Sequence, residues 1–207
     1  MKKYFLYSLC ILLGACASTY KHVNPPAVHY QDTKGAAIGF SYQYDVLYRA
    51  GNKKYAKIEK KRNVRVVALK ITNNTGRTIN PSTDIEILHD NRPLPLMDAA
   101  IAKKELKQKV PLYLLYMLLT PMTFDTYREA NGVRQARSVP VGLIIGPVLT
   151  VFNMVTAGTA NRNLEAELRE YSLDKPLANG QTMYALISFP SFDYGVLDAR
   201  LKAGPKN

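Results

Sequence analysis

The sequence lacks the residue patterns that mark the common catalytic sites. Its 207 residues include three histidines and two cysteines, and no HExxH, paired-cysteine, Walker-type or Gly-x-Ser-x-Gly motif occurs. A pair of carboxylates brought together by folding is a catalytic arrangement that sequence alone does not reveal, and 16 acidic residues are available for it. We therefore expect a non-enzyme that needs no cofactor and no metal, with an enzyme of unrecognised type as the alternative.

Acidic residues are also few relative to basic ones. The chain has 28 Lys and Arg against 16 Asp and Glu, a formal net charge of +12. Without Lys2 and Lys3 the balance is 12 − 2 = +10. Such a charge favours proximity to anionic material, such as lipid headgroups, envelope phosphates and carboxylates, or an acidic partner protein.

The N-terminus predicts a signal peptide over residues 1–15. Lys2 and Lys3 precede an apolar run, residues 4–13, that is too short for a stable membrane span. The run ends in Leu13-Gly14-Ala15-Cys16, which resembles the lipobox of bacterial lipoproteins. That resemblance implies lipid attachment at Cys16 after a thiol attack and cleavage before this residue. An ordinary secretory signal is the alternative.

An exported lipoprotein is expected in only some cell compartments and with only some partners. Cys10 lies in the predicted signal peptide, so a mature chain acylated at Cys16 would hold neither a disulfide nor a reactive thiol. Nucleic acid is not an expected partner of an exported protein. Ala17 follows the cysteine in place of the aspartate that retains many lipoproteins at the inner membrane, and no acidic run follows, unlike the export signals of surface lipoproteins in some Bacteroidota. The resemblance thus implies a lipid anchor in the outer membrane, facing the periplasm.

Residues 16–35 read as a lipidated tether, because Asn24-Pro25-Pro26 favours extended backbone and hydrophobic periodicity is absent. Residues 36–207 are expected to form a single domain, since a mature chain of about 190 residues is enough for one hydrophobic core.

Alternation with a period of two predicts β-strands within the domain. The strands are expected at residues 37–48, 64–72, 79–88, 183–189 and 196–201. Between the third and fourth, helical patterns occupy an insertion at about 98–172. The predicted fold class is α+β: an antiparallel immunoglobulin-like β-sandwich with a long helical-hairpin insertion. In layout this resembles envelope lipoproteins that join a small β-domain to an apolar helical hairpin.

Two uncharged apolar blocks, residues 110–122 and 138–161, form the arms of the predicted hairpin. The second is long enough to span a bilayer, but the first is short, and Pro140 and Pro147 weaken the second as a helix. The spacing of Gly142 and Gly146 permits close helix contact. We favour a hairpin packed mostly against the protein itself with one apolar face turned to lipid or a partner, over a membrane span. The predicted contact residues are Leu143, Ile144, Val148, Phe152 and Val155.

A basic cluster lies between the first two predicted strands. Its cations are Lys53, Lys54, Lys57, Lys60, Lys61, Arg62 and Arg65. We expect them to contact an anionic surface, where each cation contributes on the order of 1 kcal/mol. The alternative is that they keep a solvated β-hairpin soluble.

The expected function is that of a membrane-anchored periplasmic lipoprotein acting as a non-catalytic structural or protein-interaction module of the cell envelope. Its expected partners are the membrane, through the N-terminal lipid, and an envelope protein or anionic envelope surface. One alternative is a lipid-binding or membrane-perturbing protein that uses the apolar hairpin, and another is an unrecognised envelope enzyme. Burial of the five predicted contact residues would favour the interaction module, whereas a continuous exposed face would favour contact with lipid.

Overall fold

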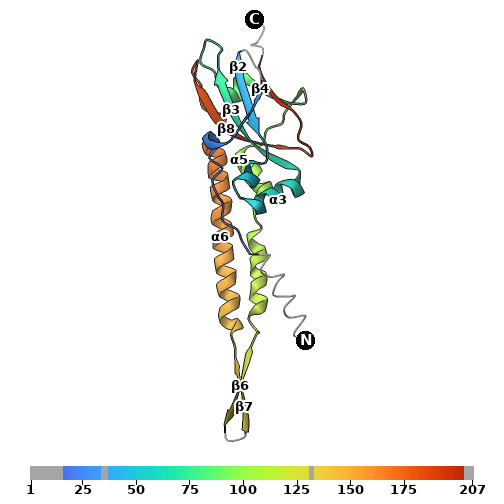
Figure 1. Ribbon diagram of the computed structural model, residues 1–207, viewed down its shortest axis with the longest axis vertical. Coiled ribbons are helices and arrows are strands. Elements are labelled where there is room, and N and C mark those ends of the chain that lie inside the picture. Colours follow the sequence, from blue (N-terminus) through green and yellow to red (C-terminus); the bar gives the residue numbers. More distant parts are fainter. Residues whose placement is uncertain (1–15, 34–36, 131–132, 203–207) are drawn as a thin grey trace. The chain divides into compact units, whose positions relative to one another are not determined.

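The computed structural model describes residues 16–33, 37–130 and 133–202, which form two compact units (Figure 1). The predicted signal peptide, residues 1–15, lies outside the described residues. We call the unit made of Tyr20–Lys107 and Asn161–Asn207 the sheet unit. The unit made of Met1–Thr19 and Gln108–Ala160 is the helix-pair unit.

Two antiparallel sheets build the sheet unit. One has the strand order β1 (Gln31–Thr33), β2 (Ile38–Gln43), β3 (Val64–Asn73) and β8 (Thr182–Pro190). The other has the order β5 (Arg92–Pro93), β4 (Ile85–His89) and β9 (Leu197–Leu201). The predicted mixed class of helices and antiparallel sheets is confirmed. The short β5 lies at a sheet edge, as expected for a segment interrupted by prolines.

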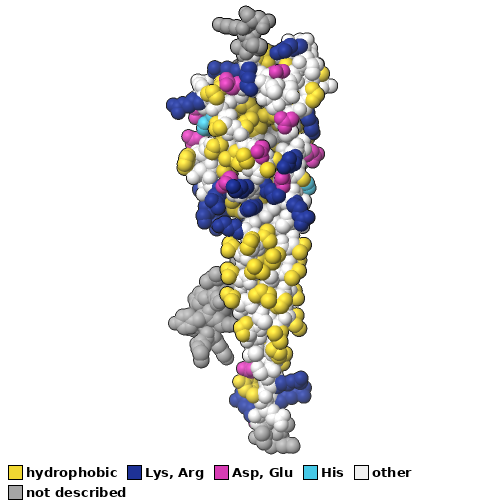
Figure 2. Space-filling view, turned by 180° about the vertical axis from the view of Figure 1, so that it is seen from behind, with side chains coloured by type: hydrophobic (Ala, Val, Ile, Leu, Met, Phe, Trp, Pro, Cys, Tyr) yellow, Lys and Arg dark blue, Asp and Glu magenta, His cyan; other side chains and the backbone are white. Residues whose placement is uncertain are grey.

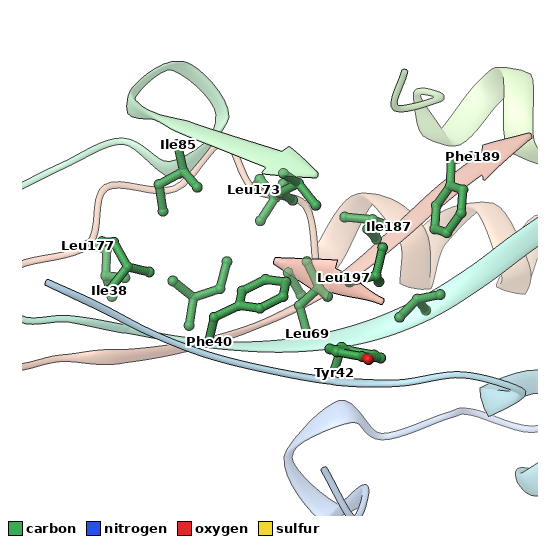
Figure 3. Packing of buried hydrophobic residues seen from close by; sticks show 14 of the residues in the cluster. Ile38, Phe40, Tyr42, Leu69, Ile85, Leu173, Leu177, Ile187, Phe189 and Leu197 are labelled. Carbon is green, nitrogen blue, oxygen red and sulfur yellow. The ribbon is translucent and has the colours of Figure 1, made fainter. Parts of the chain in front are cut away.

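One hydrophobic core joins the two sheets. Alternate residues of β2 and β3 point the same way, so Phe40 and Leu69 meet Ile187 of β8, while Ile85 and Leu197 come from the three-stranded sheet (Figure 3). This period of two is the pattern that predicts the strands from sequence.

Two short helices, α2 (Val46–Arg49) and α4 (Pro81–Asp84), occupy parts of predicted strands. The other short helices of this unit are η1 (Pro25–Ala27), α3 (Lys53–Arg62) and α5 (Ala99–Leu106), and α5 lies where a helical insertion is expected from sequence. The strand predicted over residues 37–48 ends at Gln43, because Asp45 adopts a left-handed conformation with φ of 58° and α2 follows. Residues 79–88 begin as α4, since the Asn80 side chain accepts the Ser82 N–H and Pro81 occupies the first helical turn.

The predicted tether over residues 16–35 is wrong for its greater part. Tyr20 and Val23 are buried in the sheet unit, and β1 pairs with β2. The buried carboxylate of Glu167 accepts hydrogen bonds from the Tyr20 hydroxyl (2.5 Å) and the Val23 N–H (2.8 Å). This segment shows no hydrophobic periodicity, because it is held to the sheet unit by backbone N–H groups and by the side chains of Tyr20 and Val23.

The helix-pair unit contains the 3₁₀ helix η2 (Val110–Leu119), strands β6 (Phe124–Ala130) and β7 (Val133–Val139), and helix α6 (Gly142–Glu170). The antiparallel strands β6 and β7 form a two-stranded sheet, which we call the ribbon. Helix α6 is continuous through Pro147, although this proline is expected to weaken it. From Asn161 onward its residues belong to the sheet unit.

Candidate functional site

Small residues on one side of α6 allow η2 to approach it closely. A Cβ atom built on Gly142 would lie 2.5 Å from the Thr120 carbonyl oxygen and would clash with that of Leu119. A Cβ atom on Gly146 would lie 3.2 Å from the Tyr116 carbonyl oxygen. The spacing of these two glycines thus provides the close helix contact expected from sequence.

The same side of α6 continues with Thr150, Asn153 and Ala157, all of which are buried. Ala157 packs with Tyr113 and Tyr116 of η2. The polar groups on this side have partners within the unit. The Thr150 hydroxyl donates to the Gly146 carbonyl (2.8 Å), and the Asn153 amide donates to the Leu149 carbonyl (2.7 Å).

The large apolar side chains of α6 lie on its outer side. The five predicted contact residues have exposed fractions between 58% and 70%: Leu143, Ile144, Val148, Phe152 and Val155. Helix η2 exposes four leucines in the same way: Leu112, Leu114, Leu115 and Leu118. Hydrophobic side chains cover the visible surface of these two helices (Figure 2). The exposed face is broader than the single apolar face expected from sequence.

This distribution is the reverse of that in a helix pair surrounded by water. There, large apolar residues lie between the helices and polar residues face outward. Here, small and hydrogen-bonded polar residues lie between the helices beside the partly buried Leu119, Leu149 and Met154, and most of the large apolar residues face outward. Membrane helices pack in this way, because small residues allow close backbone approach and lipid surrounds the apolar exterior. By length and composition α6 can cross a membrane.

The predicted lipid-attachment residue lies on this unit. The Tyr116 hydroxyl is 3.7 Å from the Cys16 sulfur, and the exposed Cys16 is followed by two residues that the helix pair holds. Asn153 accepts the Ala17 N–H (2.6 Å). Gln108 accepts the Ser18 N–H (3.1 Å) and donates to the Ser18 carbonyl (2.7 Å). The chain that follows Cys16 therefore lies in a fixed place along the helix pair.

The ribbon differs from the helices in being charged. Its exposed side chains include three arginines, two carboxylates and two aromatic rings: Arg128, Arg134, Arg137, Asp125, Glu129, Phe124 and Tyr127. The Arg134 guanidinium lies 4.6 Å from the centre of the Tyr127 ring on the neighbouring strand. Cations and aromatic rings in combination suit a membrane–water interface.

The predicted basic cluster is mostly one face of a helix, so the expectation of a solvated β-hairpin there is wrong. Lys and Glu favour helix, and Asn63 ends α3 in a left-handed conformation. Helical spacing places these cations on one side, opposite the buried Tyr55 and Glu59: Lys53, Lys54, Lys57, Lys60 and Lys61. Their contact with an anionic surface stays a prediction, as does that of the exposed Arg62.

Arg65 is not part of this basic face, and its predicted surface contact is wrong. Its side chain is buried, and its guanidinium donates to the Phe192 carbonyl (3.2 Å) and lies 4.3 Å from the centre of the Tyr194 ring. Arg65 is the second residue of strand β3, so its side chain points to one face of the sheet and does not belong to the charged face of α3.

Burial raises the pKa of Glu59 from its ordinary value of 4.5 to about 7, although the Val66 N–H donates to it and Arg65 lies nearby. Between these two values the folded state binds the proton more tightly than the unfolded state. We therefore expect stability to fall as pH rises, by about 3 kcal/mol between pH 4 and pH 8. Glu59→Gln, which keeps an acceptor for Val66, should abolish most of this slope. Urea unfolding at several pH values measures it, and equal slopes in both proteins would contradict the assignment.

No catalytic arrangement emerges from the part of the chain that the structure describes. His89 lies 3.3 Å from Asp193, but its Nε2 accepts the Gly195 N–H (3.1 Å), which gives it a structural partner. Among the described residues, no three His, Cys, Asp or Glu side chains are placed to hold a metal ion. A depression of about 720 Å³ in the sheet unit is lined by Asp98, which caps α5, and by Arg169, which pairs with Glu165.

The apolar blocks predict the two helices, but the side chains that hold the residues after Cys16 against them are not among the site residues predicted from sequence. Gln108 and Asn153 are polar residues beside or within apolar blocks, and this placement is the signal that could have identified them. Comparison with known proteins found no matching family model, no matching curated protein and no matching solved structure.

Proposed function

We propose that this protein is a lipoprotein of the bacterial envelope, anchored through Cys16, whose helix pair inserts into the lipid bilayer. The observation that carries the proposal is the reversed distribution of side chains in the helix-pair unit, with Gly142, Gly146 and Asn153 inside and large apolar residues outside. Contact with lipid removes that apolar surface from water, which is favourable by about 25 cal/mol per Å². Of the functions expected from sequence, this supports the lipid-contacting one.

The lipid anchor and the apolar surface support each other. Membrane affinity grows with the apolar surface that the bilayer buries, so acyl chains and an apolar protein surface strengthen binding together when both face the same bilayer. Cys16 lies beside Tyr116 on the helix pair, so acyl chains attached there would enter the same bilayer as the exposed leucines of η2. The residue after Cys16 and the absence of an acidic run favour the outer membrane, with the anchor facing the periplasm.

We further propose that the sheet unit is an immunoglobulin-like sandwich with a non-catalytic, structural role in the envelope. Two antiparallel sheets that share one core support this proposal. In this arrangement the membrane-inserted helix pair fixes the protein in place, and the sheet unit is the part available to an envelope protein or an anionic surface.

Insertion is testable by fluorescence, because the chain contains no tryptophan. Phe152→Trp places a single fluorophore on the outer side of α6. In vesicles that contain brominated phosphatidylcholine, we expect most of its emission to be quenched relative to vesicles of ordinary phosphatidylcholine, since the indole ring would touch acyl chains.

The matched control is Phe192→Trp, which places the fluorophore at an exposed position of the sheet unit. Its emission should change little between the two kinds of vesicle. Equal quenching of the two variants, or no quenching of either, would rule out insertion of the helix pair and would favour a protein partner for its apolar surface.

A further inference from the structure

We infer that the helix pair crosses the whole bilayer, so that the ribbon emerges at the face opposite Cys16 and its arginines meet anionic headgroups there. This inference rests on the proposed insertion and extends it. Insertion alone is compatible with a helix pair that enters a single leaflet or lies along one membrane surface. Length, the position of Cys16 and the chemistry of the ribbon together favour a complete crossing.

The uncharged length of the chain matches the thickness of a bilayer. No charged residue occurs between Arg137 and Arg162. The 20 helical residues from Gly142 to Asn161 rise about 30 Å, and residues 138–141 add at most about 13 Å. The sum is about 40 Å, and a bilayer with its headgroups is about 40–45 Å thick.

The position of Cys16 fixes the direction and depth of the crossing. Asn153 accepts the Ala17 N–H, and it lies eight residues, or about 12 Å of helix, from Asn161. It lies eleven residues, or about 17 Å, from Gly142. Acyl chains on Cys16 would therefore start just inside one side of the hydrocarbon layer, which is about 30 Å thick. The remaining apolar length leads across that layer to the ribbon.

The ribbon is unsuited to the hydrocarbon layer and suited to the opposite interface. A two-stranded ribbon leaves the outer edges of both strands without a ladder partner, and unsatisfied backbone groups cost several kcal/mol each in lipid. Phe124 lies where the ribbon begins, at the level where aromatic side chains are enriched in membrane proteins, and Tyr127 lies farther along the ribbon, opposite Ala136. Arg128, Arg134 and Arg137 carry the planar guanidinium groups that bind phosphate in bidentate fashion.

The crossing is testable with the double variant Gln135→Cys/Gln181→Cys. Gln135 lies on the ribbon and Gln181 in the sheet unit, and both side chains are exposed. In the mature protein, with Cys10 removed and Cys16 acylated, these would be the reactive thiols. The protein is reconstituted into sealed vesicles of phosphatidylcholine and phosphatidylglycerol, and a membrane-impermeant maleimide is added outside. Intact mass then counts the labels on each molecule, whichever way the molecule faces.

We expect each molecule to carry one label, on the ribbon or on the sheet unit, and two labels only after detergent is added. Molecules with either two labels or none in intact vesicles would place both sites on one side and overturn the crossing. If position 135 stayed unlabelled even in vesicles made permeable to the maleimide without being dissolved, the ribbon would lie within the bilayer, and this result would also overturn the crossing. Quenching of Phe152→Trp in either of these cases would leave the proposed insertion intact, whereas its absence would overturn both.

Discussion

Replacing Glu167 by alanine is expected to lower the free energy of unfolding of the sheet unit by about 3 to 5 kcal/mol. The Glu167 carboxylate is buried and accepts hydrogen bonds from the Tyr20 hydroxyl, the Val23 N–H and, at 3.3 Å, the Asn24 N–H. Alanine would leave buried donors without an acceptor and would open space beside Tyr20, whose ring packs edge-on against Tyr55 at 5.5 Å. Urea unfolding followed by circular dichroism measures the loss.

Glu170→Ala is the matched control, because it removes an exposed carboxylate from the same helix. It should change stability by less than about 0.5 kcal/mol. Glu167→Gln keeps an acceptor oxygen and should fall between the two variants. Equal unfolding midpoints for Glu167→Ala and Glu170→Ala would show that residues 20–24 do not depend on this carboxylate.

Replacing Gly142 by alanine is expected to destabilise the helix pair by about 1 to 3 kcal/mol. The added Cβ atom would lie 2.5 Å from the Thr120 carbonyl oxygen and 2.7 Å from the Met122 backbone nitrogen, and backbone atoms cannot move aside as the end of a flexible side chain can. We expect η2 to separate from the start of α6. Limited proteolysis of the protein in detergent micelles measures this as faster cleavage in the helix-pair unit.

Gly158 provides the contrast within the same helix, since a Cβ atom there would meet nothing within 4 Å. Gly158→Ala should leave cleavage unchanged or slow it, because alanine favours helix over glycine by roughly 0.5–1 kcal/mol. Faster cleavage in both variants would indicate a general sensitivity of α6 to substitution and not a close contact at Gly142.

The local sequence pattern is sufficient to predict the helices and strands whose apolar side chains recur at regular intervals. Strands β3 and β8 were predicted within two residues at either end, because Val67, Leu69 and Ile187 repeat every second position. The lysines of helix α3 form a dense charge cluster that hides its helical pattern, although their spacing by three and four residues is helical.

The arrangement of the helix pair could be predicted only in part. Gly142 and Gly146 indicate a close contact, and the five predicted contact residues are exposed, but the uncharged blocks do not indicate that the leucines of η2 are exposed as well. The contacts that hold the N-terminal residues depend on partners far away in sequence. Ala17 and Asn153 are 136 residues apart, and Tyr20 and Glu167 are 147 residues apart. No local pattern carries such information.

If the protein matures as the proposed lipoprotein, the attachment of residues 17–24 also constrains the order of events in that maturation. A peptidase that cleaves before Cys16 needs this part of the chain extended in its active site, whereas in the folded protein Asn153, Gln108 and Glu167 hold it. Acylation and cleavage would therefore have to precede the final folding of both units.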